Sequence, residues 1–70
     1  MQKGHYMNGD KIKRLRKEAN LTQFALAALA GVTRRTIISW EQSERTPNAD
    51  KIPALAAALR VTADELLKEG

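Results

Sequence analysis

The chain has 70 residues, a formal net charge of +4, no cysteine and only three aromatic residues. This length allows one small domain, and the lack of cysteine excludes a disulfide framework and a thiolate metal site and fits a reducing cytoplasm. No apolar run approaches the roughly 20 residues of a membrane span, while the positive charge suits a polyanionic partner.

Charge and hydrophobic pattern change along the chain. The first residues show no hydrophobic period and include the only histidine, His5, so we expect a disordered tail over residues 1–8 without a metal site. A single domain is expected over residues 9–68. Residues 10–19 carry a local net charge of +3 and residues 61–70 one of −2, so the basic end is expected to lie toward a phosphate backbone.

A first helix is predicted from Gly9 to Ala19. Its apolar residues recur at helical spacing, so Ile12, Leu15 and Ala19 are expected to be buried on one face. Five basic side chains belong to the same helix, and they fit either a solvated face or a face near phosphate: Lys11, Lys13, Arg14, Arg16 and Lys17.

The stretch from Gln23 to Gln42 predicts two short helices joined by a glycine turn. Its first part, residues 23–30, is rich in alanine and leucine and has no β-branched residue that would oppose a helix. Thr22 is a good N-cap for this helix, and Gly31 stands where it must stop. Thr33 is well placed to cap the second helix.

The second of these helices has two chemically different faces. Three residues share the face expected to be buried: Thr33, Ile37 and Trp40. Four share the opposite face: Arg35, Ile38, Ser39 and Gln42. The second helix therefore presents a polar face with a basic N-terminus to water.

A further helix is predicted from Asn48 to Leu59. Its inward residues are expected to be Ile52, Leu55, Ala56 and Leu59. Pro53 would clash in the helix interior, whereas with Asp50 as the cap it falls in the first turn and removes no hydrogen bond. We therefore expect a distorted first turn.

The chain ends with a short predicted helix. Thr62 and Glu65 form a capping box at its start, and Leu66 and Leu67 follow. A helix this short cannot bury both leucines, and a small domain gains stability by association. We therefore expect a homodimer formed through this part of the chain.

Several short motifs occur together at fixed spacings: Leu21-Thr22-Gln23, Leu26-Ala27, Gly31-Val32-Thr33, Thr36-Ile37-Ile38 and Glu41. In this combination the chain resembles the helix-turn-helix of the phage repressor/Cro-like family of DNA-binding proteins, the xenobiotic-response-element class. The resemblance runs from about Gly9 to Leu67. It implies an all-α, compact five-helix lambda-repressor-like domain.

The same resemblance implies two structural features. An arginine at the position of Arg16 pairs internally in this family with the glutamate that matches Glu41; a surface arginine or one touching phosphate is the alternative. The family usually has glycine where this chain has Ser43, so either the loop turns differently or Ser43 carries backbone strain.

For a helix-turn-helix of this kind, the second helix lies in the major groove of double-stranded DNA. The expected base contacts are Arg34, Arg35, Ile38 and Ser39. The expected contacts to the DNA backbone are Gln23, Thr33, Gln42 and Arg45. One of the two adjacent arginines is expected to be a non-specific phosphate contact, and Ser39 reaches either a base or a phosphate.

An apolar strip on the first helix of the motif departs from the family: Phe24, Ala25, Ala28 and Leu29. Ala30 stands where the family commonly has leucine. One interpretation is compensation, in which Leu29 or Phe24 leans inward; we favour this for Leu29. The other is a contact surface for a protein partner or a second copy, which we favour for Phe24.

Two functions fit these features. The first is a cytoplasmic, sequence-specific DNA-binding transcriptional regulator, expected to be a repressor that acts as a homodimer. The alternative is a protein-interaction module such as an antitoxin or accessory subunit, because a fold does not determine function. The chain offers no cluster of histidine, cysteine or carboxylate residues in a pocket-forming pattern, so we expect no enzyme, no metal and no cofactor.

Overall fold

The computed structural model describes residues 9–68, and within this range it contains helices and no strand. The elements are α1 (Gly9–Glu18), α2 (Gln23–Ala30), α3 (Arg34–Glu41), the short 3₁₀ turn η1 (Ala49–Lys51), α4 (Ile52–Leu59) and α5 (Ala63–Leu67). The expected all-α five-helix fold is therefore confirmed. The predicted tail over residues 1–8 lies outside the described residues. No helix in the described part is long and apolar enough to cross a membrane.

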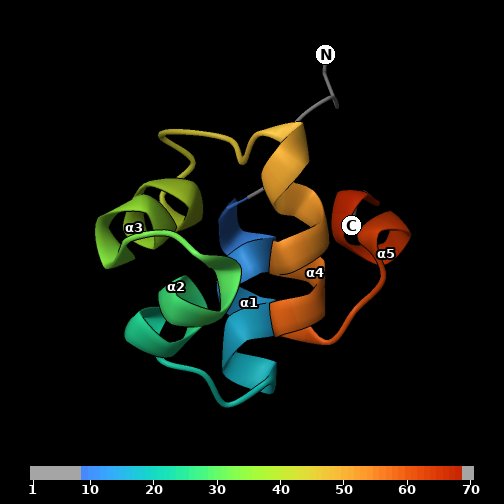
Figure 1. Cartoon of the computed structure of the whole chain (residues 1–70), viewed down its shortest axis with the longest axis horizontal. Coiled ribbons are helices and arrows are strands. Elements are labelled where there is room, and N and C mark those ends of the chain that lie inside the picture. The colour runs from blue at the N-terminus through green and yellow to red at the C-terminus, as the bar shows by residue number, and fades with distance from the viewer. Residues whose placement is uncertain (1–8, 69–70) are drawn as a thin grey trace.

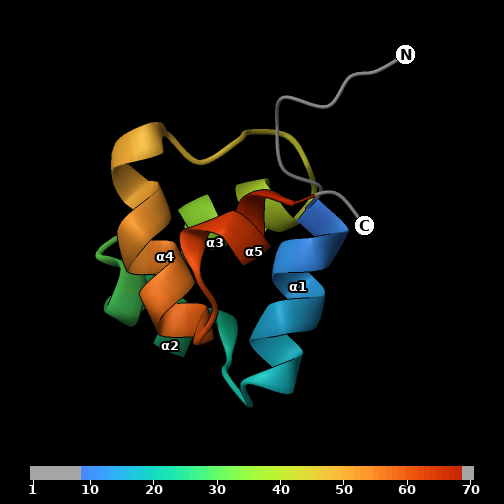
Figure 2. The same cartoon turned by 90° about the vertical axis from the view of Figure 1, so that its right-hand side faces the viewer.

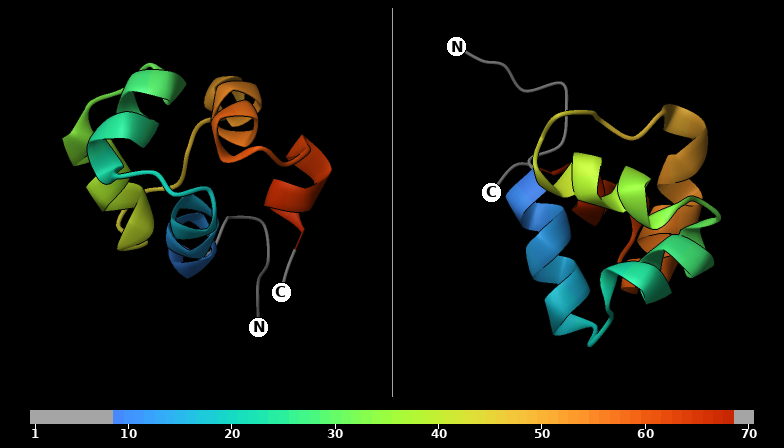
Figure 3. Two further views of the ribbon diagram at one scale, coloured as in Figure 1. Left: turned by 90° about the horizontal axis from the view of Figure 1, so that it is seen from below. Right: turned by 90° about the vertical axis from the view of Figure 1, so that its left-hand side faces the viewer.

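The helices are arranged so that α1 and α4 separate the α2–α3 pair from α5 (Figure 1). Viewed from the α5 side, α5 lies between α4 and α1 and in front of α3 (Figure 2). Viewed from the other side, α3 and α2 lie in front (Figure 3). The helix-turn-helix pair and the acidic last helix thus occupy opposite sides of the domain.

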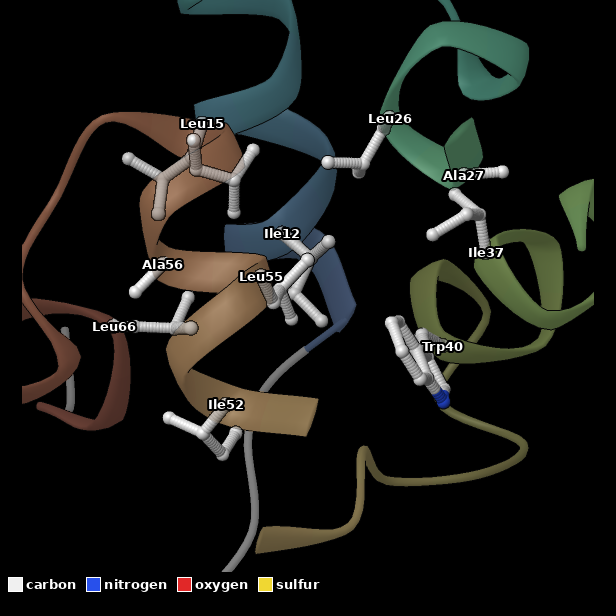
Figure 4. Packing of buried hydrophobic residues seen from close by; sticks show 11 residues of the cluster. Ile12, Leu15, Leu26, Ala27, Ile37, Trp40, Ile52, Leu55, Ala56 and Leu66 are labelled. Atoms are coloured by element: carbon white, nitrogen blue, oxygen red, sulfur yellow. The ribbon is translucent and has the colours of Figure 1, made fainter. Parts of the chain in front are cut away.

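The core is built from one fully buried aliphatic side chain of each α-helix. In chain order they are Ile12, Leu26, Ile37, Leu55 and Leu66. Burying such a side chain stabilises a fold by about 1.5–3 kcal/mol. Further leucine, isoleucine and alanine side chains and Trp40 complete the cluster between the helices (Figure 4). The core is small, so each helix is indispensable to it.

Two helix boundaries differ from those predicted. α1 ends at Glu18, and Ala19 is only half-buried because the chain leaves the helix there through Asn20, whose φ is 62°. The first turn before α4 is distorted, as Pro53 indicated, and takes the form of η1. Lys51, not Asp50, is the residue before the α-helix, because the η1 bond from Lys51 N–H to the Asn48 carbonyl already supplies the first turn.

Lys11 is buried, although it was expected among the solvated or phosphate-facing charges. Only 7% of its surface is exposed, and its Nζ donates to the carbonyl oxygens of Glu65 at 2.6 Å and Lys68 at 2.5 Å. These carbonyls belong to the C-terminal end of α5, where a helix favours a positive charge. Lys11 therefore joins α1 to α5 across the domain.

α1 begins in close contact with the end of α3. Gly9 is buried, and a Cβ there would overlap the backbone carbonyl oxygens of Trp40 and Glu41. The Gly9 N–H donates to the hydroxyl of Ser43 at 3.1 Å. Ser43 has φ 62°, so it carries the backbone strain that was one of the two expected outcomes. Its hydroxyl partly offsets this strain by satisfying an N–H at the start of α1.

Arg60 provides a test of backbone strain, because it is exposed and ends α4 with φ 64°. Arg60→Gly is expected to raise the free energy of unfolding by up to about 1 kcal/mol, since glycine adopts this conformation without a steric penalty. The measurement is thermal or urea unfolding. Ala57→Gly, on an exposed position inside the same helix, is the matched control and should lower stability by about 1 kcal/mol. Equal losses from both variants would contradict the strain.

Candidate nucleic-acid interface

The turn between α2 and α3 is held by local hydrogen bonds. The hydroxyl of Thr22 accepts from Ala25 N–H at 3.0 Å, and that of Thr33 accepts from Thr36 N–H at 3.2 Å, so both predicted N-caps are confirmed. Gly31 ends α2 with φ 73°, and a Cβ there would meet no atom within 4 Å. Backbone conformation, and not lack of space, therefore favours glycine at this turn.

α3 buries Ile37 and Trp40 and exposes Arg34 and Arg35. Thr33 was expected on the buried face and is instead exposed, because as the N-cap it precedes the helix and its side chain turns back to the backbone. Other residues of the predicted outer face differ in exposure. Ile38 and Ser39 are half-buried, whereas Gln42 and the loop residue Arg45 are exposed.

A buried ion pair joins α1 to the C-terminal end of α3. Arg16 donates to Glu41 through Nε, at 2.5 Å from Oε2, and through Nη2, at 3.2 Å from Oε1. Its Nη1 donates to the Leu21 carbonyl at 2.9 Å. The pair that the family resemblance implied is present, with both side chains at least nine-tenths buried.

Gln23 is connected to the same pair. Its Nε2 donates to Glu41 Oε1 at 3.2 Å. An amide nitrogen carries two N–H groups, so this bond orients the Gln23 side chain and leaves one donor available. The carboxylate of Glu41 thereby holds the end of α3 against α1 and orients the first side chain of α2.

A groove runs between α1 and the α3 side of the molecule. It is lined by Asp10, Lys13, Gln23, Ile38, Glu41, Gln42 and Ser43. Three of the predicted contact residues, Gln23, Ile38 and Gln42, are thus brought together. Thr33 and Arg45 lie beyond opposite ends of α3, outside this groove.

The basic charge of α1 is reduced at the surface. Lys11 and Arg16 are buried, so the exposed cations of this helix are Lys13, Arg14 and Lys17. Arg14 also approaches Glu18 at 3.5 Å in an exposed pair, which stabilises little. Lys13 lines the groove but was not among the predicted contacts. Its spacing of one helical turn from Arg16, which was expected to face α3, was the signal that could have placed it there.

The apolar strip of α2 does not compensate for the small Ala30. Leu29 is 59% exposed and Phe24 is 73% exposed, so the inward placement expected for Leu29 is wrong. Leu26, Ala27 and Ala30 form the buried face of α2, and the helical period places Leu29 outside it. The guanidinium carbon of Arg34 lies 5.7 Å from the centre of the Phe24 ring, a contact that sequence analysis missed.

Nothing in the described range suggests a metal centre, because no three histidine, cysteine or carboxylate side chains gather between residues 9 and 68. The exposed groups near α3 include the cations Arg34, Arg35 and Lys13, hydrogen-bond donors such as Gln42, and the carboxylates of Asp10 and Glu44. The cations at the start of α3 are suited to binding an anionic partner.

Comparison with known proteins agrees with this geometry. A protein-family profile described as helix-turn-helix matches residues 12–66. The repressor protein C2 of Salmonella phage P22 is 40% identical over 60 residues, which are 86% of this chain and 28% of that protein. The HTH-type transcriptional activator BcrR of Enterococcus faecalis is 38% identical over 58 residues, 83% of this chain and 28% of that protein. The chain thus spans little more than a quarter of either relative.

A solved structure gives the same result in three dimensions. The crystal structure of the P22 c2 repressor protein, in complex with a synthetic operator and in the presence of Tl⁺, superposes with a TM-score of 0.80. The two chains are 40% identical, and the match covers 86% of this chain and 91% of that one.

The Arg16–Glu41 pair generates a prediction about stability. Glu41→Ala should lower the free energy of unfolding by about 3–5 kcal/mol, because it leaves the guanidinium of Arg16 buried without its carboxylate. Urea unfolding measures the change. Glu44→Ala is the matched control: Glu44 is exposed and three residues away, so its loss should stay within about 0.5 kcal/mol. Similar values for the two variants would contradict a structural role for Glu41.

Proposed function

The chain belongs to the helix-turn-helix family, and from that membership we propose that it is a sequence-specific DNA-binding transcriptional repressor. The family comprises DNA-binding regulators rather than enzymes. The observation that carries the proposal is the exposure of Arg34 and Arg35 in the first turn of α3. Cations at the positive end of a helix lower its stability by about 0.3–1 kcal/mol each, so a DNA partner accounts for them better than folding does.

We propose residues 9–68 as the DNA-binding domain, with α3 in the major groove. The proposed base contacts are Arg34, Arg35, Ile38 and Ser39. The proposed backbone contacts are Gln23, Thr33, Gln42 and Arg45. The side chain of Gln23, oriented by Glu41, supports the assignment at the start of α2, where the helix N-terminus also favours phosphate.

Repression is the sign of regulation that the P22 relative and its operator complex support. The P22 relative is named a repressor and the Enterococcus faecalis relative an activator. We propose a cytoplasmic repressor.

The experiment that tests the proposal selects bound sequences from a random DNA pool, with the wild type, Arg35→Ala and Arg35→Lys in parallel. The wild type should select one motif, and its affinity should fall steeply as salt rises. Both variants should lose about 1–3 kcal/mol of preference at one base pair and keep weak, salt-sensitive binding, because lysine retains the charge of arginine but not its planar fork.

Three other results would count against parts of this proposal. Failure of the wild type to enrich any motif would refute sequence-specific binding. Salt-independent binding would instead favour the protein-interaction module. In the third, Arg35→Lys selects the same motif as the wild type while Arg34→Lys selects a motif with a weaker preference at one base pair. That result would assign the base contact to Arg34 and a phosphate contact to Arg35.

We further propose that the protein forms a homodimer through α5 and that this dimer binds a two-fold operator. Leu66 is fully buried, but Leu67, the last residue of α5, is 55% exposed. An apolar contact there would leave both copies of α3 free for half-sites about 34 Å apart.

Leu67→Glu tests this dimer. It should convert the protein to a monomer in light scattering and weaken operator binding, because a charge would be placed in the contact between the two copies. Leu29→Glu is the matched control, at a similarly exposed leucine on α2. A wild type that remains monomeric at high concentration with and without operator would refute the dimer, and loss of association only with Leu29→Glu would relocate it to α2.

A further inference from the structure

Phe24 is the most exposed large apolar side chain of the described residues, on the second position of α2. A single exposed apolar residue needs no explanation by itself. What distinguishes Phe24 is its neighbour: the guanidinium carbon of Arg34 lies 5.7 Å from the centre of the ring, within the range of a cation–π contact. The contact bridges ten residues and exists because the Gly31 turn folds α3 back toward α2.

Arg34 has little else to stabilise it. It is the first residue of α3, where the helix dipole disfavours a cation, and within residues 9–68 it forms no ion pair. The negative face of an aromatic ring is therefore the one favourable partner that the described structure provides for this charge.

An aromatic ring beside Arg34 and a carboxylate beside Arg34 would have different effects on how its guanidinium recognises a base. A carboxylate would occupy the N–H groups of the guanidinium, which are the groups that read a base. An aromatic ring attracts the face of the guanidinium and leaves the N–H donors at its edge free. A side chain that is held in this way loses less conformational freedom when it binds.

Consecutive residues of α2 thus contact both ends of α3. Gln23 bonds to Glu41, the last residue of α3, and Phe24 lies against Arg34, the first. The N-terminus of α2 therefore contacts α3 at its first and last residues, with one aromatic and one polar contact.

We propose that Phe24 is a positioning residue that orients Arg34 for base recognition and so contributes to sequence specificity. The proposal rests on the proposed function, namely that α3 reads DNA. Phe24 acts through Arg34, so its effect should depend on the presence of that arginine.

A double-mutant cycle on DNA affinity tests the inference. The variants are Phe24→Leu, Arg34→Gln and their combination, and the probes are the DNA selected by the wild type and random DNA at the same salt concentration. Phe24→Leu should weaken binding to the selected DNA about two- to fivefold, the factor that corresponds to an exposed cation–π contact, and leave binding to random DNA unchanged. In the Arg34→Gln background it should have no further effect.

Phe24→Tyr is the conservative control. It keeps the aromatic face and should restore the wild-type affinity and base preference, which a general loss of apolar surface would not predict. Because Phe24 is exposed, the melting temperatures of all these variants should stay close to those of their parents, so altered binding would not reflect unfolding.

The outcomes separate this inference from the proposed function. If the wild type selects a motif but Phe24→Leu binds as the wild type does, the positioning role is refuted and DNA reading stands. Equal losses in both backgrounds would also refute it, because Phe24 would then act on DNA or on a protein partner independently of Arg34. If the wild type selects no motif, the proposed function itself fails.

Discussion

The carboxylate of Glu41 is the point on which the arrangement of the helices depends. It accepts two N–H groups of Arg16 from α1 and one from Gln23 of α2, and it belongs to the last residue of α3. Burying these charges is unfavourable by itself, and only the complete set of hydrogen bonds compensates for it. The pair therefore contributes orientation more than stability. Together with Gln23, it holds three helices in the one arrangement in which every hydrogen-bonding partner is satisfied.

Polar contacts between the helices are necessary to fix their arrangement, because the apolar core is small. One fully buried aliphatic side chain per helix provides cohesion but little directional information. Lys11 binds the end of α5, and the Ser43 hydroxyl binds the start of α1 at Gly9, whose missing side chain lets the two backbones approach. Ser43 in place of the family's glycine exchanges a strain-free turn for a hydrogen bond to that helix start.

Folding also redistributes the charge that the proposed partner would meet. Two of the five cations of α1 are consumed by internal contacts, and α5 with its exposed carboxylates lies on the far side from α3. The surface beside α3 is therefore less basic than the composition of α1 indicates, but it is well separated from the acidic end. Specificity in such a surface depends on a few oriented side chains more than on total charge.

The sequence alone determined what depends on neighbours in the chain. The helix caps were predictable from the sequence, namely Thr22, Thr33 and Gly31, and so were the helical periods. Each of these features involves residues within about four positions of one another. Only the tertiary structure decided the direction of Lys11 and the contact between Phe24 and Arg34. A long side chain with an apolar stem fits either water or the interior, and the choice is made by helices distant in sequence that supply or withhold partners.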